Sequence, residues 1–243
     1  MAERDLAKVL SDLTPARLRL GRAGAALPTG AALAFQLDHA RARDAVNTAL
    51  KPDGLADALG RDVIVVRSQA ADRKEYLRRP DLGRRLREGD EAMLPTDGCD
   101  LAIVIADGLS AAAVHGHAAS LALAIIERLG DWRIGPVVAA HQARVAIGDS
   151  IGEGMKADLV CVLIGERPGL SSPDSLGAYL TWQPRSGRKD SERNCVSNIR
   201  PPHGLSYDDA ADTIVRLLKA AQVRQMTGVA LKDGEGLIGG SEQ

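Results

Sequence analysis

The sequence predicts an α/β protein, in which a helical N-terminal region is followed by a Rossmann-like domain built on a mostly parallel sheet. Two observations carry this prediction. Residues 1–60 contain no run typical of a strand, whereas from Arg61 onward short β-branched runs alternate with alanine-rich stretches at helical spacing. This alternation is typical of parallel strands joined by crossover helices. We therefore expect the helical region to span residues 1–60 and the Rossmann-like domain to span residues 61–243.

The N-terminal region is expected to contain a helix between residues 29 and 50. Its apolar side chains recur near helical spacing at Leu33, Leu37, Ala40 and Ala45. Thr29 follows a turn and is expected to cap this helix, since its hydroxyl oxygen can accept a hydrogen bond from a backbone N–H group. The breaker sequence at residues 51–54 (KPDG) then interrupts the chain.

Five later segments have the β-branched, apolar composition of strands. They are Asp62–Arg67, Asp100–Ala106, Pro136–Ala140, Asp158–Gly165 and Ala178–Trp182. The middle segments are apolar without interruption, as expected for strands that are covered on both faces.

Two stretches predict crossover helices. Ser110–Leu129 is expected to form one, with Ser110 at its N-cap. Tyr207–Gln225 is expected to form the other, because two aspartates at its start favour a helix N-terminus. The glycine-rich tail at residues 234–243 is expected to be disordered.

The composition excludes several classes of protein. With 243 residues, 45% of them hydrophobic, the chain is long enough to bury a sizeable core. It has no apolar run of the roughly 20 residues that a membrane helix needs, and its charged N-terminus lacks the layout of a signal peptide. The net charge of −1 and the six aromatic residues argue against nucleic-acid binding. We therefore expect a cytosolic protein whose partners are neither nucleic acids nor membranes.

No metal site is expected in this chain. Its three cysteines, Cys99, Cys161 and Cys195, are too far apart for a disulfide framework or a zinc ligand set. His115 and His117 lie two residues apart on a predicted helix, so their side chains point in different directions. One is expected at the surface and the other packed.

Positive charge gathers in two short stretches of the chain. They contain Arg73, Lys74, Arg78, Arg79, Arg84, Arg85 and Arg87 in one, and Arg17, Arg19 and Arg22 in the other. A solvated face is one interpretation. The other is a surface for a partner subunit, because arginine is enriched at protein interfaces.

Candidate ligand-binding residues lie in the loops after the strands, because ligands of an open α/β sheet bind beyond the carboxyl ends of its strands. These loops are residues 107–110, 166–170 and 194–202. Glu166 follows an apolar strand, so its carboxylate is expected to accept a hydrogen bond from an amide or hydroxyl at a fixed place. The alternative is an ordinary surface pair with Arg167. Cys195 is expected in a polar loop rather than in a core strand, a placement that chance also explains.

The sequence leaves two other functions open. The segment 148–152 (GDSIG) matches the G-x-S-x-G pattern of serine hydrolases and follows the strand-like residues 144–147, with His203 as the only histidine downstream. Neither a dinucleotide-binding nor a phosphate-loop glycine motif occurs, so NAD and ATP lose their best support. A serine hydrolase and a non-catalytic nucleotide-binding or scaffold module stay open as alternatives.

Several blocks in a fixed order point to one family. They are residues 17–24 (RLRLGRAG), 35–39 (FQLDH), 76–85 (YLRRPDLGRR), 106–110 (ADGLS), 144–153 (RVAIGDSIGE), 163–170 (LIGERPGL) and 195–199 (CVSNI). Through these blocks the chain resembles the small subunits of ethanolamine ammonia-lyases along nearly its whole length.

The resemblance implies an adenosylcobalamin-dependent enzyme that converts ethanolamine to acetaldehyde and ammonia by a radical mechanism. It implies that the chain is active only with a large subunit, which holds most of the ethanolamine site, in a higher-order assembly of large–small pairs. The small subunit would contact the cobalamin at the interface through Val145, Glu166 and Cys195, and would carry no catalytic residue. Many relatives have a longer N-terminal extension linked to bacterial microcompartments, so the cytosol is expected here and a microcompartment is the alternative.

Overall fold

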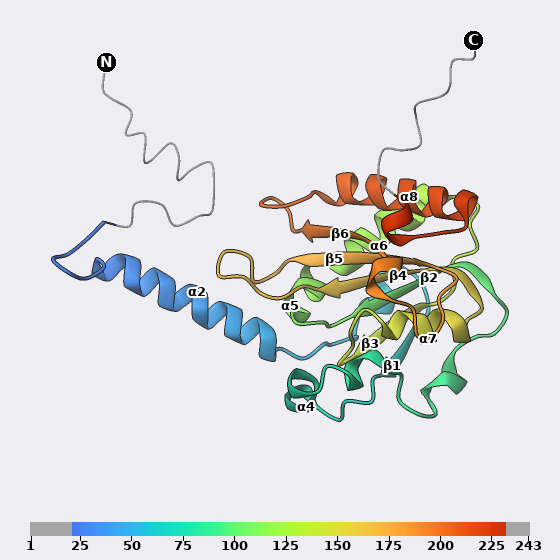
Figure 1. Cartoon of the computed structure of the whole chain (residues 1–243), viewed down its shortest axis with the longest axis horizontal. Coiled ribbons are helices and arrows are strands. Elements are labelled where there is room, and N and C mark those ends of the chain that lie inside the picture. Colours follow the sequence, from blue (N-terminus) through green and yellow to red (C-terminus); the bar gives the residue numbers. More distant parts are fainter. Residues whose placement is uncertain (1–20, 232–243) are drawn as a thin grey trace, which may run out of the picture.

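The computed structural model describes residues 21–231. Its centre is a six-stranded sheet with the strand order β1-β3-β2-β4-β5-β6. The strands β1, β3, β2 and β4 run parallel, while β5 and β6 are antiparallel to their neighbours. Their bounds are Val63–Arg67 (β1), Cys99–Ala106 (β2), Val137–His141 (β3), Ala157–Gly165 (β4), Leu176–Trp182 (β5) and Asn194–Ile199 (β6). The predicted α/β class with a mostly parallel, Rossmann-like sheet is confirmed (Figure 1).

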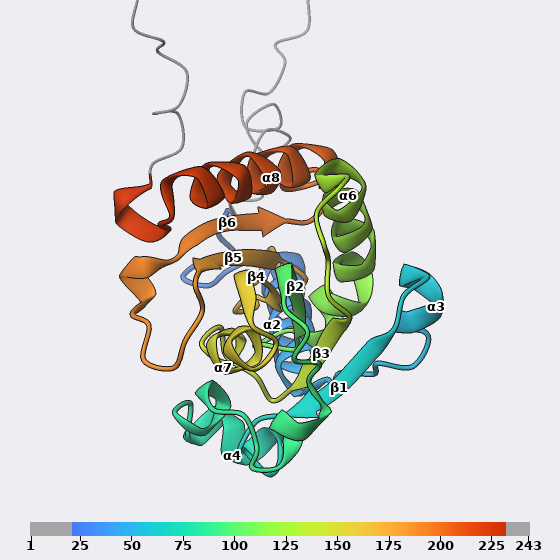
Figure 2. The same cartoon turned by 90° about the vertical axis from the view of Figure 1, so that its right-hand side faces the viewer.

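The helices lie on both faces of this sheet (Figure 2). Their bounds are Thr29–Asn47 (α2), Leu55–Leu59 (α3), Arg73–Arg78 (α4), Ala111–Ala113 (α5), Ala119–Leu129 (α6), Ile147–Gly154 (α7) and Tyr207–Arg224 (α8). Helices α3, α6 and α8 pack on one face, and α7 packs on the other. A π-helical turn at Val114–Ala118 joins α5 to α6, and four short 3₁₀ turns lie at Leu82–Arg84, Asp90–Met93, Asp190–Glu192 and Gly228–Ala230.

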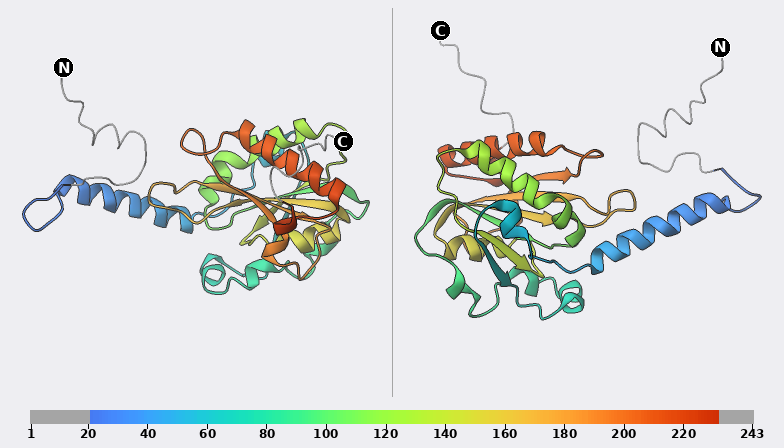
Figure 3. Two further views of the ribbon diagram at one scale, coloured as in Figure 1. Left: turned by 45° about the horizontal axis from the view of Figure 1, so that its top comes forward. Right: turned by 180° about the vertical axis from the view of Figure 1, so that it is seen from behind.

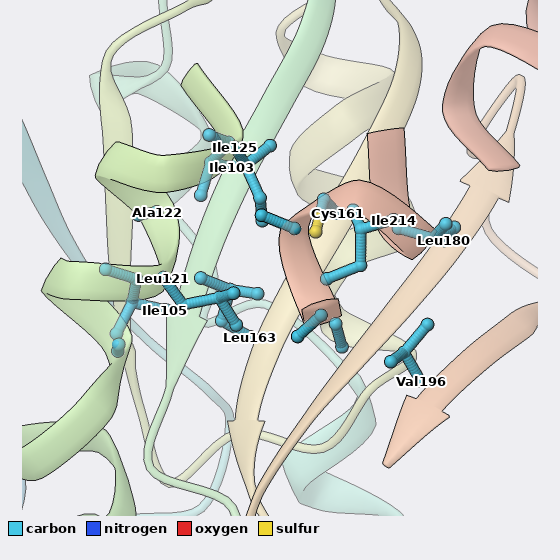
Figure 4. Packing of buried hydrophobic residues seen from close by; sticks show 14 of the residues in the cluster. Ile103, Ile105, Leu121, Ala122, Ile125, Cys161, Leu163, Leu180, Val196 and Ile214 are labelled. Atoms are coloured by element: carbon cyan, nitrogen blue, oxygen red, sulfur yellow. The ribbon is translucent and has the colours of Figure 1, made fainter. Parts of the chain in front are cut away.

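The strand β2 explains why its sequence is apolar without a break. Ile103 and Ile105 point to the face covered by α6 and α8, whereas Ala102 and Val104 point to the face covered by α7. Successive side chains of a strand alternate between the two faces, so a strand covered on both sides needs apolar residues at every position. Figure 4 shows the first of these two layers, in which Ile103 and Ile125 meet between strand and helix.

The five predicted strands correspond to β1 to β5, but β6 was predicted to be part of a polar loop, and that prediction is wrong. Cys195 lies in this strand and pairs with Tyr179 of β5. Val196 and Ile199 are buried, while the side chains between them are exposed. An antiparallel edge strand can face water on one side, and its polar exposed residues gave the segment the composition of a loop.

The predicted helix caps have different outcomes. Ser110 caps the helix that follows it, since its Oγ accepts a hydrogen bond from the Ala113 N–H group at 3.2 Å. The prediction for Thr29 is wrong, because Thr29 is already the first residue of α2 and no side chain caps that helix. Pro28 occupies the N-cap position with ψ of 142°, the extended conformation typical of a cap residue.

Helix α2 projects from the rest of the protein (Figures 1 and 3). Ala45 is its one buried residue, whereas Leu33, Phe35 and Leu37 are 59%, 45% and 51% exposed. No helix within residues 21–231 is long and apolar enough to cross a membrane. The predicted disorder at residues 234–243 and the arginines at 17 and 19 lie outside the described residues. The division into two regions at residue 60 stays a prediction.

Candidate functional site

A cleft of about 390 Å³ opens at the carboxyl edge of the parallel strands, where the sequence predicted a ligand. It is formed by the residues that follow β2, β3 and β4, together with two tyrosines. The lining consists of Tyr76, Gly108, Leu109, Arg144, Val145, Ile164, Gly165, Glu166, Arg167 and Tyr179. Val145 and Glu166, two of the three predicted contact residues, therefore face the same cleft.

A wider hollow of about 730 Å³ lies at the opposite edge of the sheet, where β1 and β3 begin. Its lining includes Ala56, Arg61 and Pro136, and none of the predicted contact residues. We favour the smaller cleft as the candidate site, because strand-end loops converge at the carboxyl edge of an open α/β sheet.

The Glu166 carboxylate is held at three points. Its Oε2 atom accepts hydrogen bonds from the Ser175 hydroxyl at 2.5 Å and from the Asn198 N–H group at 3.3 Å, and its Oε1 atom accepts one from the Ser197 hydroxyl at 2.5 Å. A carboxylate has about four acceptor positions, so the described residues leave about one of them unused. Glu166 forms no ion pair with Arg167 in the part of the chain that the structure describes, so the surface-pair alternative is not what the structure contains.

A glycine makes room for this carboxylate. A Cβ atom on Gly177 of β5 would lie 2.9 Å from Glu166 Oε1, closer than such contacts allow. The side chain of Glu166 therefore lies across β5 and reaches β6, which joins the ends of β4, β5 and β6 at the cleft.

Cys195 adjoins the cleft through Tyr179 rather than lining it. The two residues are cross-strand partners of β5 and β6. Desolvation raises the pKa of Cys195 above its ordinary value, the neighbouring Tyr179 hydroxyl opposes this, and the charge of Glu166 adds to it. Desolvation also raises the pKa of Tyr179, so both groups keep their protons at neutral pH.

Val145 does not lie in a strand, contrary to the strand-like pattern of residues 144–147. The chain turns here, with the Arg144 N–H group donating to the Gly83 carbonyl oxygen at 2.8 Å, and α7 begins at Ile147. The side chain of Val145 is half-buried against the apolar layer under α7. The part of this side chain that is not packed lines the cleft, so Val145 presents a small apolar surface there.

The G-x-S-x-G segment does not form a nucleophile elbow, which needs the serine at a turn between a strand and a helix. Residues 148–152 lie inside α7, and Ser150 Oγ is 3.3 Å from Ser186 Oγ. A Cβ atom on Gly148 would lie 2.4 Å from Val162 Cγ2, and one on Gly152 would lie 2.3 Å from Pro184 Cγ. Gly148 therefore allows α7 to approach the sheet closely, and Gly152 allows it to approach the loop after β5.

The sequence did not identify the buried ion pair behind the cleft. Asp107, at the end of β2, is fully buried and accepts hydrogen bonds at 2.9 Å from the N–H groups of Gln142 and Ala143. The guanidinium of Arg73 lies 3.5 Å from it and donates to the carbonyl oxygens of Val46 and Gly108 at 2.6 and 2.8 Å. Burial raises the pKa of Asp107, and the two backbone hydrogen bonds and Arg73 oppose this. This network fixes the loops after β2 and β3.

The basic stretch that contains Arg73 is thus not simply a solvated face. Arg73 is structural, while Arg79 pairs with Asp81 and Arg87 pairs with Asp90, both at 2.7 Å. Of this network only Asp107 and Gly108 lie in one of the family-like segments, residues 106–110, whereas Arg73 lies just before the segment at residues 76–85.

A mostly parallel sheet covered on both faces, with a cleft at its carboxyl edge, places the chain in the Rossmann-like class of α/β folds. The family model described as ethanolamine ammonia-lyase light chain (EutC) matches residues 4–232. The chain therefore belongs to the ethanolamine ammonia-lyase light chain family.

Curated relatives agree with this assignment. The chain is 57% identical over 233 residues to the ethanolamine ammonia-lyase small subunit of Bradyrhizobium diazoefficiens, a match that covers 92% of this chain and 89% of the relative. It is 52% identical over 235 residues to the small subunit of Azotobacter vinelandii, covering 92% and 87%. It is also 52% identical over 242 residues to that of Xanthomonas campestris pv. campestris, covering 95% and 88%.

Proposed function

We propose that this chain is the small subunit of a cytosolic ethanolamine ammonia-lyase and holds adenosylcobalamin at the interface with a large subunit. The observation that carries the proposal is the cleft at the carboxyl edge, which Val145 and Glu166 share and which Cys195 adjoins through Tyr179. The enzyme would convert ethanolamine to acetaldehyde and ammonia, with ethanolamine bound mainly by the large subunit.

The residues of the cleft fit one side of a cobalamin. The corrin ring carries amide side chains, which need donors and acceptors on a preformed surface. Glu166 offers one free acceptor position, and Val145 offers an apolar contact. Ligand pockets for drug-sized molecules measure roughly 300–1,000 Å³. A cleft of about 390 Å³ is too small for a whole cobalamin, which supports a cofactor shared between two subunits.

The cofactor, when bound, supplies the radical chemistry of the reaction. This chain's residues bind and orient it. Desolvation raises the pKa of Tyr179, which lines the cleft, and of Cys195, which lies beside it, so both groups stay neutral at neutral pH. Glu166 is fixed by Ser175 and Ser197. It is therefore suited to positioning and not to proton transfer.

Helix α2 supports the large subunit as the partner. The relatives carry the name small subunit, and α2 presents Leu33, Phe35 and Leu37 to solvent over a helix of 19 residues. Most helical stability in proteins comes from packing of an apolar face against other parts of the structure. We propose that the large subunit covers α2.

The proposal is tested by co-expressing the chain with a large subunit and measuring cobalamin affinity of the purified complex by ultrafiltration. Glu166→Gln removes the carboxylate acceptor but keeps the shape of the side chain. It is expected to weaken cobalamin binding by about 1.5–3 kcal/mol, the net value of a hydrogen bond to a charged group. Ethanolamine turnover at saturating cofactor should be restored largely to the wild-type rate.

Glu127→Gln, on the exposed side of α6, is the matched control and should leave the affinity unchanged. An unaltered affinity in the Glu166→Gln complex would remove Glu166 from the site. Ethanolamine turnover by the isolated chain would contradict the division of roles between the two subunits.

A further inference from the structure

Arg144 has an unused hydrogen-bond donor in the wall of the cleft. Its side chain lines the cleft beside Val145, and its Nε atom is buried without a hydrogen-bond partner. A buried donor without a partner is costly, and more so when it carries a charge. Native structures seldom keep such a group unless something else satisfies it.

The guanidinium of Arg144 is held in place. It lies over the ring of Tyr76, with 4.7 Å between the guanidinium carbon and the ring centroid. Tyr76 is fully buried and donates a hydrogen bond to the Ala143 carbonyl oxygen at 2.9 Å. A Cβ atom on Gly83 would lie 2.7 Å from Tyr76 Cε2 and 3.1 Å from Arg144 Cγ, so only glycine leaves room for this stack. The arginine is therefore fixed before any ligand arrives.

The positive charge of Arg144 also has no carboxylate partner within the described residues. The ring of Tyr76 contacts a second guanidinium, that of Arg73, at 4.8 Å, but Arg73 is paired with Asp107. The cleft thus has a cationic donor on one wall and the acceptor Glu166 on another.

We propose that Arg144 binds the ligand of this cleft by donating a hydrogen bond to an oxygen acceptor on it. The inference rests on the proposed function and deepens it, since a cobalamin has two kinds of such oxygen: the carbonyl oxygens of the corrin amides and the phosphodiester of the nucleotide loop. Arginine suits either, because its planar fork donates to carbonyl and phosphate oxygens from a rigid frame.

The experiment measures equilibrium binding of hydroxocobalamin, which does not turn over, to the purified complex with the large subunit. Arg144→Gln removes the charge, and Arg144→Lys keeps the charge but not the fork. Arg61→Gln, an exposed arginine ahead of β1 at the opposite edge of the sheet, is the control. Cobinamide, which lacks the phosphodiester and nucleotide, is the second ligand. Thermal melting and the yield of the complex report folding.

Arg144→Gln is expected to weaken hydroxocobalamin binding about ten- to a hundredfold, with a smaller loss for Arg144→Lys and none for Arg61→Gln. A loss for hydroxocobalamin and cobinamide alike would assign the acceptor to a corrin amide. A loss for hydroxocobalamin alone would assign it to the phosphodiester.

Equal affinities of the wild-type and Arg144→Gln complexes for hydroxocobalamin would overturn the inference, and a lower melting temperature alone would reduce Arg144 to a structural residue. If the wild-type complex itself bound no hydroxocobalamin, the proposed function would fail instead.

Discussion

Helix α2 and strand β2 both carry apolar side chains, but they differ in how far this chain buries them. Seven of the eight residues in β2 are buried within this chain, whereas α2 buries one of its 19. Helix α2 also has no side-chain cap, no acidic residue in its first turn and no basic residue in its last. Since caps and terminal charges stabilise a helix on their own, their absence leaves α2 dependent on packing. The comparison shows that the sheet is buried within this chain, whereas α2 gains little stabilisation from it, as the proposed docking of a large subunit on α2 requires.

If this comparison is right, breaking the buried ion pair that joins α7 to the residue before β6 should cost much more than breaking an ion pair of α2. Arg193 donates to both oxygens of Asp149 at 2.6 and 2.7 Å, and both side chains are buried. Asp149→Ala should lower the free energy of unfolding by about 3–5 kcal/mol, because the buried Arg193 then loses its bidentate partner and keeps only the longer pair with the exposed Asp190 at 3.6 Å. Chemical denaturation of the isolated chain measures this change.

The matched change in α2 is Asp44→Ala, which removes an exposed pair with Arg43 at 3.6 Å. It should not alter unfolding measurably, because surface ion pairs contribute little. Similar losses for the two variants would show that α2 belongs to the same cooperative unit as the sheet.

Two glycines sharpen the comparison by packing. A Cβ atom on Gly165, at the end of β4, would lie 2.0 Å from the Ser110 carbonyl oxygen, whereas one on Gly30 in α2 meets nothing within 4 Å. Gly165→Ala is therefore expected to destabilise the chain by about 3 kcal/mol, at the upper end of the usual cost of overpacking. Gly30→Ala should be neutral or slightly stabilising, because alanine favours a helix over glycine by about 1 kcal/mol. Thermal melting of both variants tests the pair, and a destabilising Gly30→Ala would contradict the open surroundings of α2.

The smallest effect on stability is expected for the exposed face of α2. Leu33 and Leu37 lie four residues apart on one side of the helix. Changing both to Gln should leave the melting temperature of the isolated chain unchanged but weaken its affinity for the large subunit tenfold or more, since burying a leucine contributes about 1.5–3 kcal/mol. Isothermal titration of the two subunits measures this affinity. Leu123→Gln, on the exposed side of α6, is the control, and an unchanged affinity in the double variant would leave α2 without its proposed partner.

Much of the fold could be predicted because it depends on local patterns. The apolar runs of β2 and β4 are visible in the sequence, since burial on both faces requires apolar residues at every position. Strand β6 was missed because its exposed face is polar and its buried residues are few. Thr29 was misplaced by one position, which is within the usual uncertainty of helix ends.

In the candidate site, too, some residues could be predicted from local sequence, whereas their tertiary contacts could not. Glu166 could be singled out from its place after an apolar strand, but its tie to Ser197 joins residues 31 apart and has no local signature. The pair of Arg73 and Asp107 is likewise formed by tertiary contact. Arg144 precedes Val145 in the segment at residues 144–153, yet its unpartnered Nε–H group becomes visible only once the ring of Tyr76 and the cleft are in place.

The three hydrogen bonds on Glu166 have a kinetic consequence. Because Ser175, Ser197 and the backbone of Asn198 already hold the carboxylate, its rotamer entropy is lost on folding and not on ligand binding. Preorganisation of this kind lowers the cost of association, and binding then requires little rearrangement of the strand ends. The rate at which a ligand enters should accordingly depend on docking of the partner subunit and on diffusion, while β6 keeps one conformation throughout.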